Sequence, residues 1–262
     1  MAEDDARTGY DDRPLVAVFR PDDDRLERAC SLLAELGVEP VPDPMLEVEP
    51  TDRRPREDAA YAVLTSKTGA ELVAERGWEP DGSTLCAIGP ATAETMTEAG
   101  YDVDIVPEEY TSSGLVEYLD EKRDLEGATI EVARSDHGSP VLLEGLADAG
   151  ADVHETVLYR LVRPPGSGIS VALAETRDLA AACFTSSLTV EHFLEIARER
   201  GTESAAIAGL EAGVVGAIGT PTRETLAGHG IEADVVASEA TFETLARETV
   251  DRIRSDRSEA VD

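Results

Sequence analysis

The sequence predicts an α/β fold in which two similar domains each hold a parallel sheet with helices on both faces. Three observations support this prediction. A segment that begins at Leu85 nearly repeats at Val215, short valine-rich runs alternate with helical patterns, and proline-rich stretches interrupt this alternation twice. Strands that alternate with helices are typical of parallel sheets.

The repeat follows the order a–b–a′–b′. LCAIGPATAETMTEAGYDVDIVPEEYTSSGL, from Leu85, matches VGAIGTPTRETLAGHGIEADVVASEATFETL, from Val215, at a constant offset of 130 residues. A second pair, 16–39 and 130–152, matches outside these segments. Each half therefore encodes one α/β unit, and two similar facing units predict a cleft in which function resides.

The first unit begins with the valine-rich run Leu15–Phe19, which predicts a buried strand. Asp22–Asp24 then caps a helix, and Gly37 ends it in the position that favours a left-handed residue. The stretch 39–50 holds four prolines and an extended apolar run, Met45–Val48. It therefore predicts a strand-like linker.

Strands and helices alternate again after this linker. Strands are expected at Ala62–Leu64, Leu85–Ile88, Val103–Val106 and Thr129–Ala133, and helices over Ala70–Glu75, from Gly89–Thr92 to Gly100, from Thr111 to Leu119, and over Gly138–Ala149. The apolar strand in 155–168 ends in Pro-Pro-Gly and predicts a second linker, after which b repeats. Two linkers imply that the chain crosses twice between domains. The periodicity leaves open whether a folds with b or with b′.

The charge of the chain is extreme, with a formal net charge of −32 from 55 acidic and 23 basic residues. Lysine occurs only at Lys67 and Lys122, and the acids are spread along the sequence rather than gathered in blocks. This pattern is typical of proteins that stay soluble in molar salt, where the Debye length falls to about 3 Å. We therefore expect a halophilic protein, with an acidic docking surface as the alternative. No basic stripe predicts a nucleic-acid partner.

The sequence lacks membrane, cofactor and metal signals. No apolar run approaches the roughly 20 residues that span a bilayer, and MAEDDARTGYDD lacks the apolar core of a signal peptide. Neither GxGxxG nor GxxxxGKS/T occurs, so no nucleotide cofactor is expected. The three cysteines and four histidines show no metal-ligand spacing. We expect a cytoplasmic protein with buried thiols, no cofactor, no metal and no membrane partner.

Candidate binding residues lie where strands end and helices begin. Ligands of open parallel sheets bind at these carboxyl ends, and the unpaired N–H groups of helix starts favour anions. Ordinary helix capping is the alternative for each single turn. The turns with Gly, Ser or Thr in this place are Thr65-Ser66-Lys67, Gly89-Pro90-Ala91-Thr92, Thr111-Ser112-Ser113, Thr185-Ser186-Ser187, Gly219-Thr220-Pro221-Thr222 and Thr241.

Four further side chains are candidates. Arg20 and Arg134 follow strands, and each either faces the cleft or pairs with a surface acid. Lys67 follows a Thr-Ser turn in a chain nearly free of lysine. Tyr159 places a hydroxyl in the second apolar linker strand, where core packing is the alternative role. The residues alone leave both roles open in each case.

Several short motifs cover nearly the whole folded chain in a fixed order. They are FRP at 19–21, LGVEPVPDPMLEVEP at 36–50, LTSKTGAEL at 64–72, AIGPATAETMTEAGYDVDIVPEEYTSSGL at 87–115, LADAGADVHETVLYRLV at 146–162, FTSS at 184–187 and AIGTPTRETLAGHGI at 217–231. This ordered set resembles the uroporphyrinogen-III synthase family.

The resemblance implies two flavodoxin-like domains, each a doubly wound parallel sheet, joined by a two-stranded β linker through which the chain passes over and back. In this scheme a folds with b′, and a′ folds with b. The implied boundaries are 14–38 plus 166–253 for domain 1, 51–155 for domain 2, 39–50 and 156–165 for the linker strands, and 1–13 and 254–262 for disordered tails.

The resemblance also implies an enzyme. Members of the family cyclise the linear tetrapyrrole hydroxymethylbilane to uroporphyrinogen III, with loss of water and inversion of ring D. This step belongs to tetrapyrrole biosynthesis, which leads to haem, sirohaem and cobalamin. The implied partners are the substrate and, transiently, hydroxymethylbilane synthase, and a monomer without cofactor or metal is expected.

Site residues follow from the matching motifs. The linker tyrosine of the family corresponds to Tyr159, which is expected to assist departure of the substrate hydroxyl, and the threonine after the second AIG turn corresponds to Thr222. That turn shifts the usual proline by one position, which puts its backbone donors in question. The expected substrate-binding residues are Arg20, Thr65, Ser66, Lys67, Gly89, Thr92, Thr111, Ser186, Ser187, Gly219 and Thr222.

Two alternatives lack this activity: a ligand-binding or regulatory module of the same fold, and a two-domain anion-binding protein of the periplasmic type. A fused DNA-binding domain would favour the first, and the sequence has none. The second conflicts with the acidic start of the chain, which does not read as a signal peptide.

Overall fold

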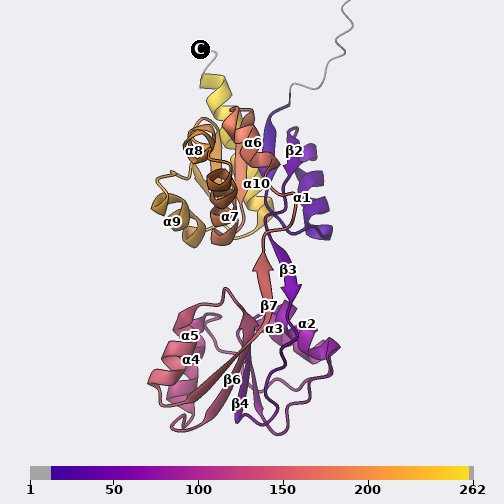
Figure 1. Ribbon diagram of the computed structural model, residues 1–262, viewed down its shortest axis with the longest axis vertical. Helices are drawn as coiled ribbons and strands as arrows, with labels where there is room; N and C mark the ends of the chain where they lie inside the picture. The colour runs from indigo at the N-terminus through magenta and orange to yellow at the C-terminus, as the bar shows by residue number, and fades with distance from the viewer. Residues whose placement is uncertain (1–12, 260–262) are drawn as a thin grey trace, which may run out of the picture. The chain divides into compact units, whose positions relative to one another are not determined.

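A computed structural model describes residues 13–259, which divide into two compact units (Figure 1). Unit 1 comprises the described residues up to Glu47 together with those from Val162 onward, and unit 2 is Val48–Leu161. Each unit is an α/β structure built on a largely parallel sheet, so the predicted fold class is confirmed.

Unit 1 has a five-stranded sheet in the order β10-β9-β8-β1-β2, in which all neighbours are parallel. The strands are β1 (Leu15–Val18), β2 (Glu39–Pro42), β8 (Leu179–Phe184), β9 (Val214–Ala217) and β10 (Val235–Val236). Its helices are α1 (Asp24–Glu35), α6 (Ile169–Glu175), α7 (Ser187–Glu199), α8 (Glu203–Leu210), α9 (Thr220–Gly228) and α10 (Phe242–Glu259).

Helices cover both faces of this sheet, as expected for a doubly wound arrangement. On one face, α1 and α10 bury apolar side chains such as Leu33 and Leu245. On the other, α6 to α9 pack over a core in which Phe19 stacks on Phe184, with ring centroids 4.6 Å apart. Phe193 meets both rings edge-on. Three of the four phenylalanines of the chain therefore fill this one core.

Unit 2 has a five-stranded sheet in the order β3-β7-β6-β4-β5. The strands are β3 (Glu47–Pro50), β4 (Tyr61–Leu64), β5 (Thr84–Ala87), β6 (Thr129–Ser135) and β7 (Asp152–Val162), and the helices are α2 (Lys67–Glu75), α3 (Pro90–Glu98), α4 (Ser112–Lys122) and α5 (Pro140–Asp148). Figure 1 shows α4 and α5 on one face of this sheet and α2 and α3 on the other, each pair closing its own apolar cluster.

The internal repeat is also a structural repeat. In unit 2 the backbone N–H of Leu85 donates to the Asp104 carboxylate at 2.8 Å, and in unit 1 Val215 donates to Asp234 at the same distance. Both pairs obey the offset of 130 residues found in the sequence. The two halves thus fix the start of β5 and of β9 by the same side-chain-to-backbone bond.

The expectation of a strand over Val103–Val106 needs correction. Only an isolated bridge joins Cys86 to Ile105. The backbone N–H groups of Asp104 and Ile105 both donate to the Leu85 carbonyl, and the N–H of Ala87 donates to the Ile105 carbonyl. The equivalent segment of unit 1, which carries the same aspartate bond, forms the two-residue strand β10.

The boundaries of the predicted linkers also need correction. Residues 39–42, expected in a linker, form β2 and pair in register with β1. Their prolines are tolerated because β2 is an edge strand, where a missing N–H costs no ladder bond. Residues 156–162, also expected in a linker, belong to β7, which runs unbroken from Asp152.

The tail expected from residue 254 is helical up to Glu259, because α10 continues through it. An Arg252–Asp256 pair one turn apart supports this last part of the helix, and the Arg254 guanidinium donates to the Leu36 carbonyl. The expected tail at 1–13 falls mostly on residues 1–12, which lie outside the described residues, as do 260–262.

The contact between α6 and α8 yields a stability prediction. A Cβ added to Gly209 in α8 would lie 1.7 Å from the Ala174 carbonyl oxygen of α6, so the two helices would have to separate. Gly209→Ala is expected to destabilise unit 1 by about 3 kcal/mol. Far-UV circular dichroism during urea unfolding in molar KCl measures this loss, and the fluorescence of Trp78, the only tryptophan, reports unit 2 separately.

Gly228→Ala is the matched control, because Gly228 also lies in a helix and a Cβ there meets nothing within 4 Å. This variant should unfold at the wild-type midpoint, or gain up to about 1 kcal/mol from helix propensity. Equal midpoints for the two variants would contradict the close approach of α8 to α6.

Candidate functional site

In unit 2, two residues that the sequence suggested separately are in direct contact. The Tyr159 hydroxyl on β7 donates to Ser66 Oγ at 3.0 Å. Ser66 follows β4 and is the N-cap of α2, where its Oγ also accepts the N–H of Gly69 at 3.0 Å. A serine hydroxyl has two acceptor lone pairs and one proton. With both lone pairs engaged, the Ser66 proton is the part of this group left to donate to a ligand.

Tyr159 is only 6% exposed. Its ring packs in the cluster formed by α2, α3 and the sheet, so the packing role and the polar role coexist in one side chain. Thr65, half-buried, precedes Ser66 at the end of β4. Lys67 is the exposed first residue of α2 and forms no ion pair with any described residue.

The starts of α3 and α9 both lack a side-chain cap. The N-cap of α3 is Gly89, that of α9 is Gly219, and neither start has a side-chain hydrogen bond to its first-turn N–H groups. The first intrahelical bonds run from Ala93 to Gly89 and from Arg223 to Gly219. The N–H groups before Ala93 and Arg223 are therefore available to an anion.

The shifted proline changes which donors remain but not how many. Pro90 removes the first N–H of α3, whereas Pro221 removes the second N–H of α9. The side chains of Thr92 and Thr222 are buried, at 5% and 3% exposure. These two threonines can therefore contribute to an anion site mainly through their backbone N–H groups.

The turns at Thr111 and Ser186 perform the capping role that the sequence left open. Thr111 Oγ1 accepts the N–H of Gly114 at 3.0 Å. Ser186 and Thr189 form a reciprocal capping box at the start of α7. Each of these side chains already holds its own helix, which reduces its capacity to accept a further donor.

In unit 1, Ser187 connects two of the predicted turns. Its hydroxyl donates to the Pro221 carbonyl at 3.1 Å and accepts from Thr225 at 2.8 Å. The start of α7 is thereby fixed to the start of α9. Thr185 donates to the Phe19 carbonyl at 2.6 Å and fixes the end of β8 to that of β1.

The two arginine candidates have different surroundings. Arg134 is buried, its Nε lies 2.6 Å from Glu155, and its guanidinium also donates to the Ser139 carbonyl. Arg134 therefore joins β6 to β7 and to the start of α5, in agreement with the second of its two alternatives, pairing with an acid. Arg20 lies over the ring of Phe242, 5.1 Å from its centroid, at the carboxyl edge of unit 1.

Tyr110 was not predicted from the sequence. Its side chain is 60% exposed and lies against Gly89, where an added Cβ would come within 3.3 Å of Tyr110 Cβ. An exposed aromatic ring thus stands beside the uncapped start of α3. The available signal was an aromatic residue directly before the Thr111 cap, in a chain with only 4% aromatic residues.

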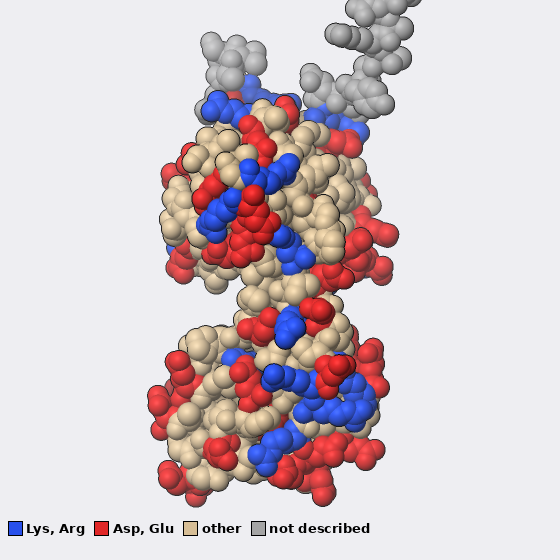
Figure 2. Space-filling view, viewed as in Figure 1, with Lys and Arg blue, Asp and Glu red and all other residues tan. Residues whose placement is uncertain are grey.

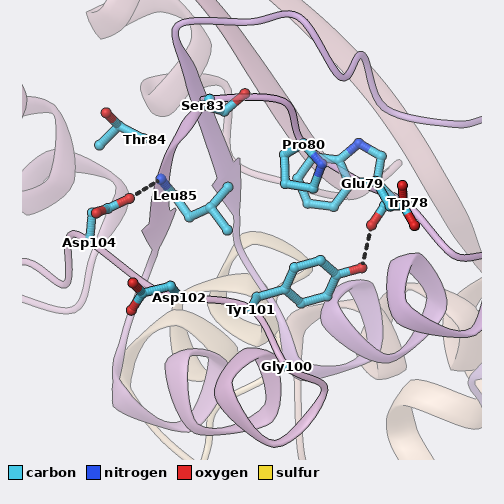
Figure 3. A pocket seen from close by; sticks show the side chains of 11 residues that line it. Trp78, Glu79, Pro80, Ser83, Thr84, Leu85, Gly100, Tyr101, Asp102 and Asp104 are labelled. Atoms are coloured by element: carbon cyan, nitrogen blue, oxygen red, sulfur yellow. Dashed lines mark hydrogen bonds between the residues drawn. The ribbon is translucent and has the colours of Figure 1, made fainter.

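Unit 2 has a hollow of about 560 Å³ beside Thr84, at the start of β5 (Figure 3). This is the edge of the sheet opposite the one where Ser66 and Gly89 lie. The Tyr101 hydroxyl points to the Trp78 carbonyl across it, and the Asp104 carboxylate points to the Leu85 N–H. Its charged side chains are the carboxylates of Glu79, Asp102 and Asp104. Such a lining repels anions, so the hollow is a poor candidate for an anionic ligand.

Within the described part of the chain, no group of His, Cys, Asp and Glu side chains could hold a metal ion, and no helix is long and apolar enough to cross a membrane. Burial raises the pKa of the Cys86 and Cys183 thiols to about 12. These cysteines stay protonated at neutral pH and are not nucleophiles. Figure 2 shows the acidic side chains scattered over the visible face of each unit.

Comparisons with known proteins identify the family. A family model described as uroporphyrinogen-III synthase HemD matches residues 27–247. A Methanothermobacter thermautotrophicus protein provisionally named uroporphyrinogen-III synthase is 31% identical over 233 residues, which are 83% of this chain and 90% of the relative. An Archaeoglobus fulgidus protein with the same provisional name is 31% identical over 185 residues, 70% of this chain and 75% of the relative.

Solved structures show the same fold. A mutant uroporphyrinogen III synthase from Thermus thermophilus matches with a TM-score of 0.67 and 19% identity, over 93% of this chain and 99% of that one. The enzyme from Helicobacter pylori matches with a TM-score of 0.61 and 15% identity, over 92% and 99%. The chain therefore belongs to the uroporphyrinogen-III synthase family.

Proposed function

We propose that this protein is the enzyme that cyclises hydroxymethylbilane to uroporphyrinogen III, with loss of water and inversion of ring D, in tetrapyrrole biosynthesis. The observation that carries the proposal is the family match over residues 27–247. Haem, sirohaem and cobalamin are the classes of product that this step can supply.

The chemistry of the substrate fits the polar edges of the two units. Hydroxymethylbilane carries two carboxylates on each of four pyrroles, and free substrate closes spontaneously to the uninverted isomer. The enzyme must therefore hold the chain in the geometry from which the inverted ring forms, which is a task of positioning and charge stabilisation. The uncapped starts of α3 and α9 offer backbone donors for carboxylates, each contact worth roughly 0.3–1 kcal/mol.

Tyr159 is the residue that we assign to the leaving hydroxyl. Loss of water leaves a cationic azafulvene, which the terminal ring attacks through its substituted carbon to form a spiro intermediate, and fragmentation and reclosure then invert the ring. Departure of the hydroxyl needs a hydrogen bond or a proton at oxygen. Tyr159 donates to Ser66, and the Ser66 O–H that remains lies at the start of α2, so a proton can be delivered through this pair, which supports the assignment.

We further propose that both units are flavodoxin-like. When the strands of unit 1 are renumbered along the chain, their order across the sheet is 2-1-3-4-5, which is the order of the flavodoxin fold. Strands β4 to β7 of unit 2, renumbered in the same way, give the order 2-1-3-4. In this scheme β3 and the last residues of β7 form the linker through which the chain passes over and back.

The setting of the enzyme is also a proposal. We place it in the cytoplasm of a halophilic cell as a monomer that needs no cofactor and meets hydroxymethylbilane synthase transiently. Its acidic composition supports the halophilic setting. High salt would also screen the long-range repulsion between a chain with a net charge of −32 and a substrate with eight carboxylates.

A coupled assay tests the function. Hydroxymethylbilane is generated in situ in molar KCl, and the oxidised products are separated by isomer. The proposal expects predominantly the type III isomer. Protein that is folded in the same salt and yields only the spontaneous type I isomer would rule out the synthase and favour a binding module.

Tyr159→Phe tests the catalytic assignment. This variant removes one hydroxyl but leaves the bond from Gly69 N–H to Ser66 Oγ in place, so α2 keeps its cap. The rate of type III formation is expected to fall at least about a hundredfold, the lower end of the range for loss of general-acid catalysis. Tyr101→Phe is the control, since it deletes a comparable hydrogen bond at the opposite edge of unit 2. Wild-type rates in Tyr159→Phe would remove Tyr159 from the mechanism.

Salt dependence tests the halophilic setting. Because the acids repel one another, we expect both helical content and activity to rise with KCl up to molar concentrations. Circular dichroism and the isomer assay, run on the same samples from 0.1 to 3 M KCl, measure the two. Full stability and activity in dilute buffer would contradict the salt adaptation.

A further inference from the structure

Unit 1 gathers positive charge at one place in a strongly acidic chain. Four arginines line a hollow of about 440 Å³ that runs along α1, from Arg25 to Glu35, beside the start of α10. The hollow has an apolar floor, because Phe242 and Ala29 are 6% and 2% exposed. Its charged lining consists of Arg20, Arg25, Arg28, Arg247, Glu35 and Glu243.

Two of these guanidinium groups are held by acids, and two are not. Arg25 pairs with Asp23, and Arg247 pairs with Glu243. Arg20 and Arg28 form no ion pair with any residue that the structure describes. The lining of one hollow therefore brings together two guanidinium groups that have no carboxylate partner among the described residues.

The Arg20 guanidinium lies where burial and two neighbouring arginines disfavour its charge, which the Asp23 carboxylate offsets in part. Burial, followed by repulsion from Arg25, lowers the pKa of Arg20 below its ordinary value. Arg28 adds a further repulsion. A bound carboxylate would relieve this repulsion and would accept the planar pairs of N–H bonds that guanidinium groups form best.

The hollow lies at the same edge of the sheet as the other candidate residues of unit 1. Arg20 follows the end of β1 by two residues, and Phe242 is the first residue of α10. The Ser187 turn lies at the carboxyl end of β8, which neighbours β1, and the Gly219 turn lies at the carboxyl end of β9, the next strand along the sheet. A ligand spread along this edge would therefore reach the arginines on the face that α1 and α10 cover.

We propose that the hollow lined by Arg20, Arg28 and Phe242 is a carboxylate subsite that takes the acetate and propionate groups of one pyrrole of the linear tetrapyrrole. The inference rests on the proposed function and adds to it a place for substrate charge on unit 1. Its volume falls within the range of about 300–1,000 Å³ that is usual for small-molecule sites.

Arg28→Gln tests the subsite, because Arg28 is exposed and its loss leaves no buried group unsatisfied. In the coupled assay at fixed KCl, KM is expected to rise about tenfold while kcat stays within about twofold, as for a lost charge-assisted contact to bound substrate. Arg28→Lys should recover part of the loss. The control is Arg198→Gln, which removes an exposed arginine that pairs with Glu203 in the same unit.

The outcomes separate the subsite from the function. If wild type makes the type III isomer and the Arg28 variants keep the wild-type KM, the subsite is wrong and the function stands. If wild type makes only the type I isomer, the function fails and the assignment to a tetrapyrrole falls with it. Calorimetric titration with citrate gives a separate readout. If Arg28→Gln no longer binds citrate but keeps the wild-type KM, the hollow binds a small free anion rather than the substrate. That result would overturn the proposal.

Discussion

Because the strands of each sheet are largely parallel, the helices that follow them begin at the same edge of the sheet. The first backbone N–H groups of these helices, which have no intrahelical partners, therefore lie together at that edge. Serine and threonine caps satisfy these groups at α2, α4 and α7, whereas Gly89 and Gly219 leave α3 and α9 without such a cap. Backbone donors attract anions without adding cations. The chain has a net charge of −32 and its substrate is a polyanion. The placement of these few donors therefore decides where the carboxylates of the substrate can bind.

The two halves retain the same scaffold and differ where chemistry is proposed. The bond from a strand N–H to an aspartate recurs in both, at Asp104 and Asp234. The serines that cap α2 and α7 do not have equivalent surroundings. Ser66 accepts the hydroxyl of Tyr159, whereas Ser186 is engaged with Thr189 in a closed capping box. Duplication supplied two similar edges, and only one of them presents a phenol and a serine hydroxyl together.

Local sequence signals predicted most strands, most helices and the Gly37 stop, because these depend on neighbouring residues. They could not predict that 103–106 would pair with β5 only through an isolated bridge, since the equivalent segment of unit 1 forms β10 from a similar sequence. Nor could spacing reveal the Tyr159–Ser66 contact or the grouping of Arg28 with Arg247. Both arise from packing between segments far apart in the chain. Tyr110 was overlooked because exposure cannot be read from residue type.

The position of β1 has a consequence for synthesis on the ribosome. β1 lies between β2 and β8, so its second neighbour emerges more than a hundred residues after it. Unit 2 is continuous and can fold as soon as it leaves the exit tunnel. The segment that holds β1 and β2 must wait as part of the nascent chain, with the edge of β1 that pairs with β8 still open. Translation speed and chaperone access therefore matter most for this segment.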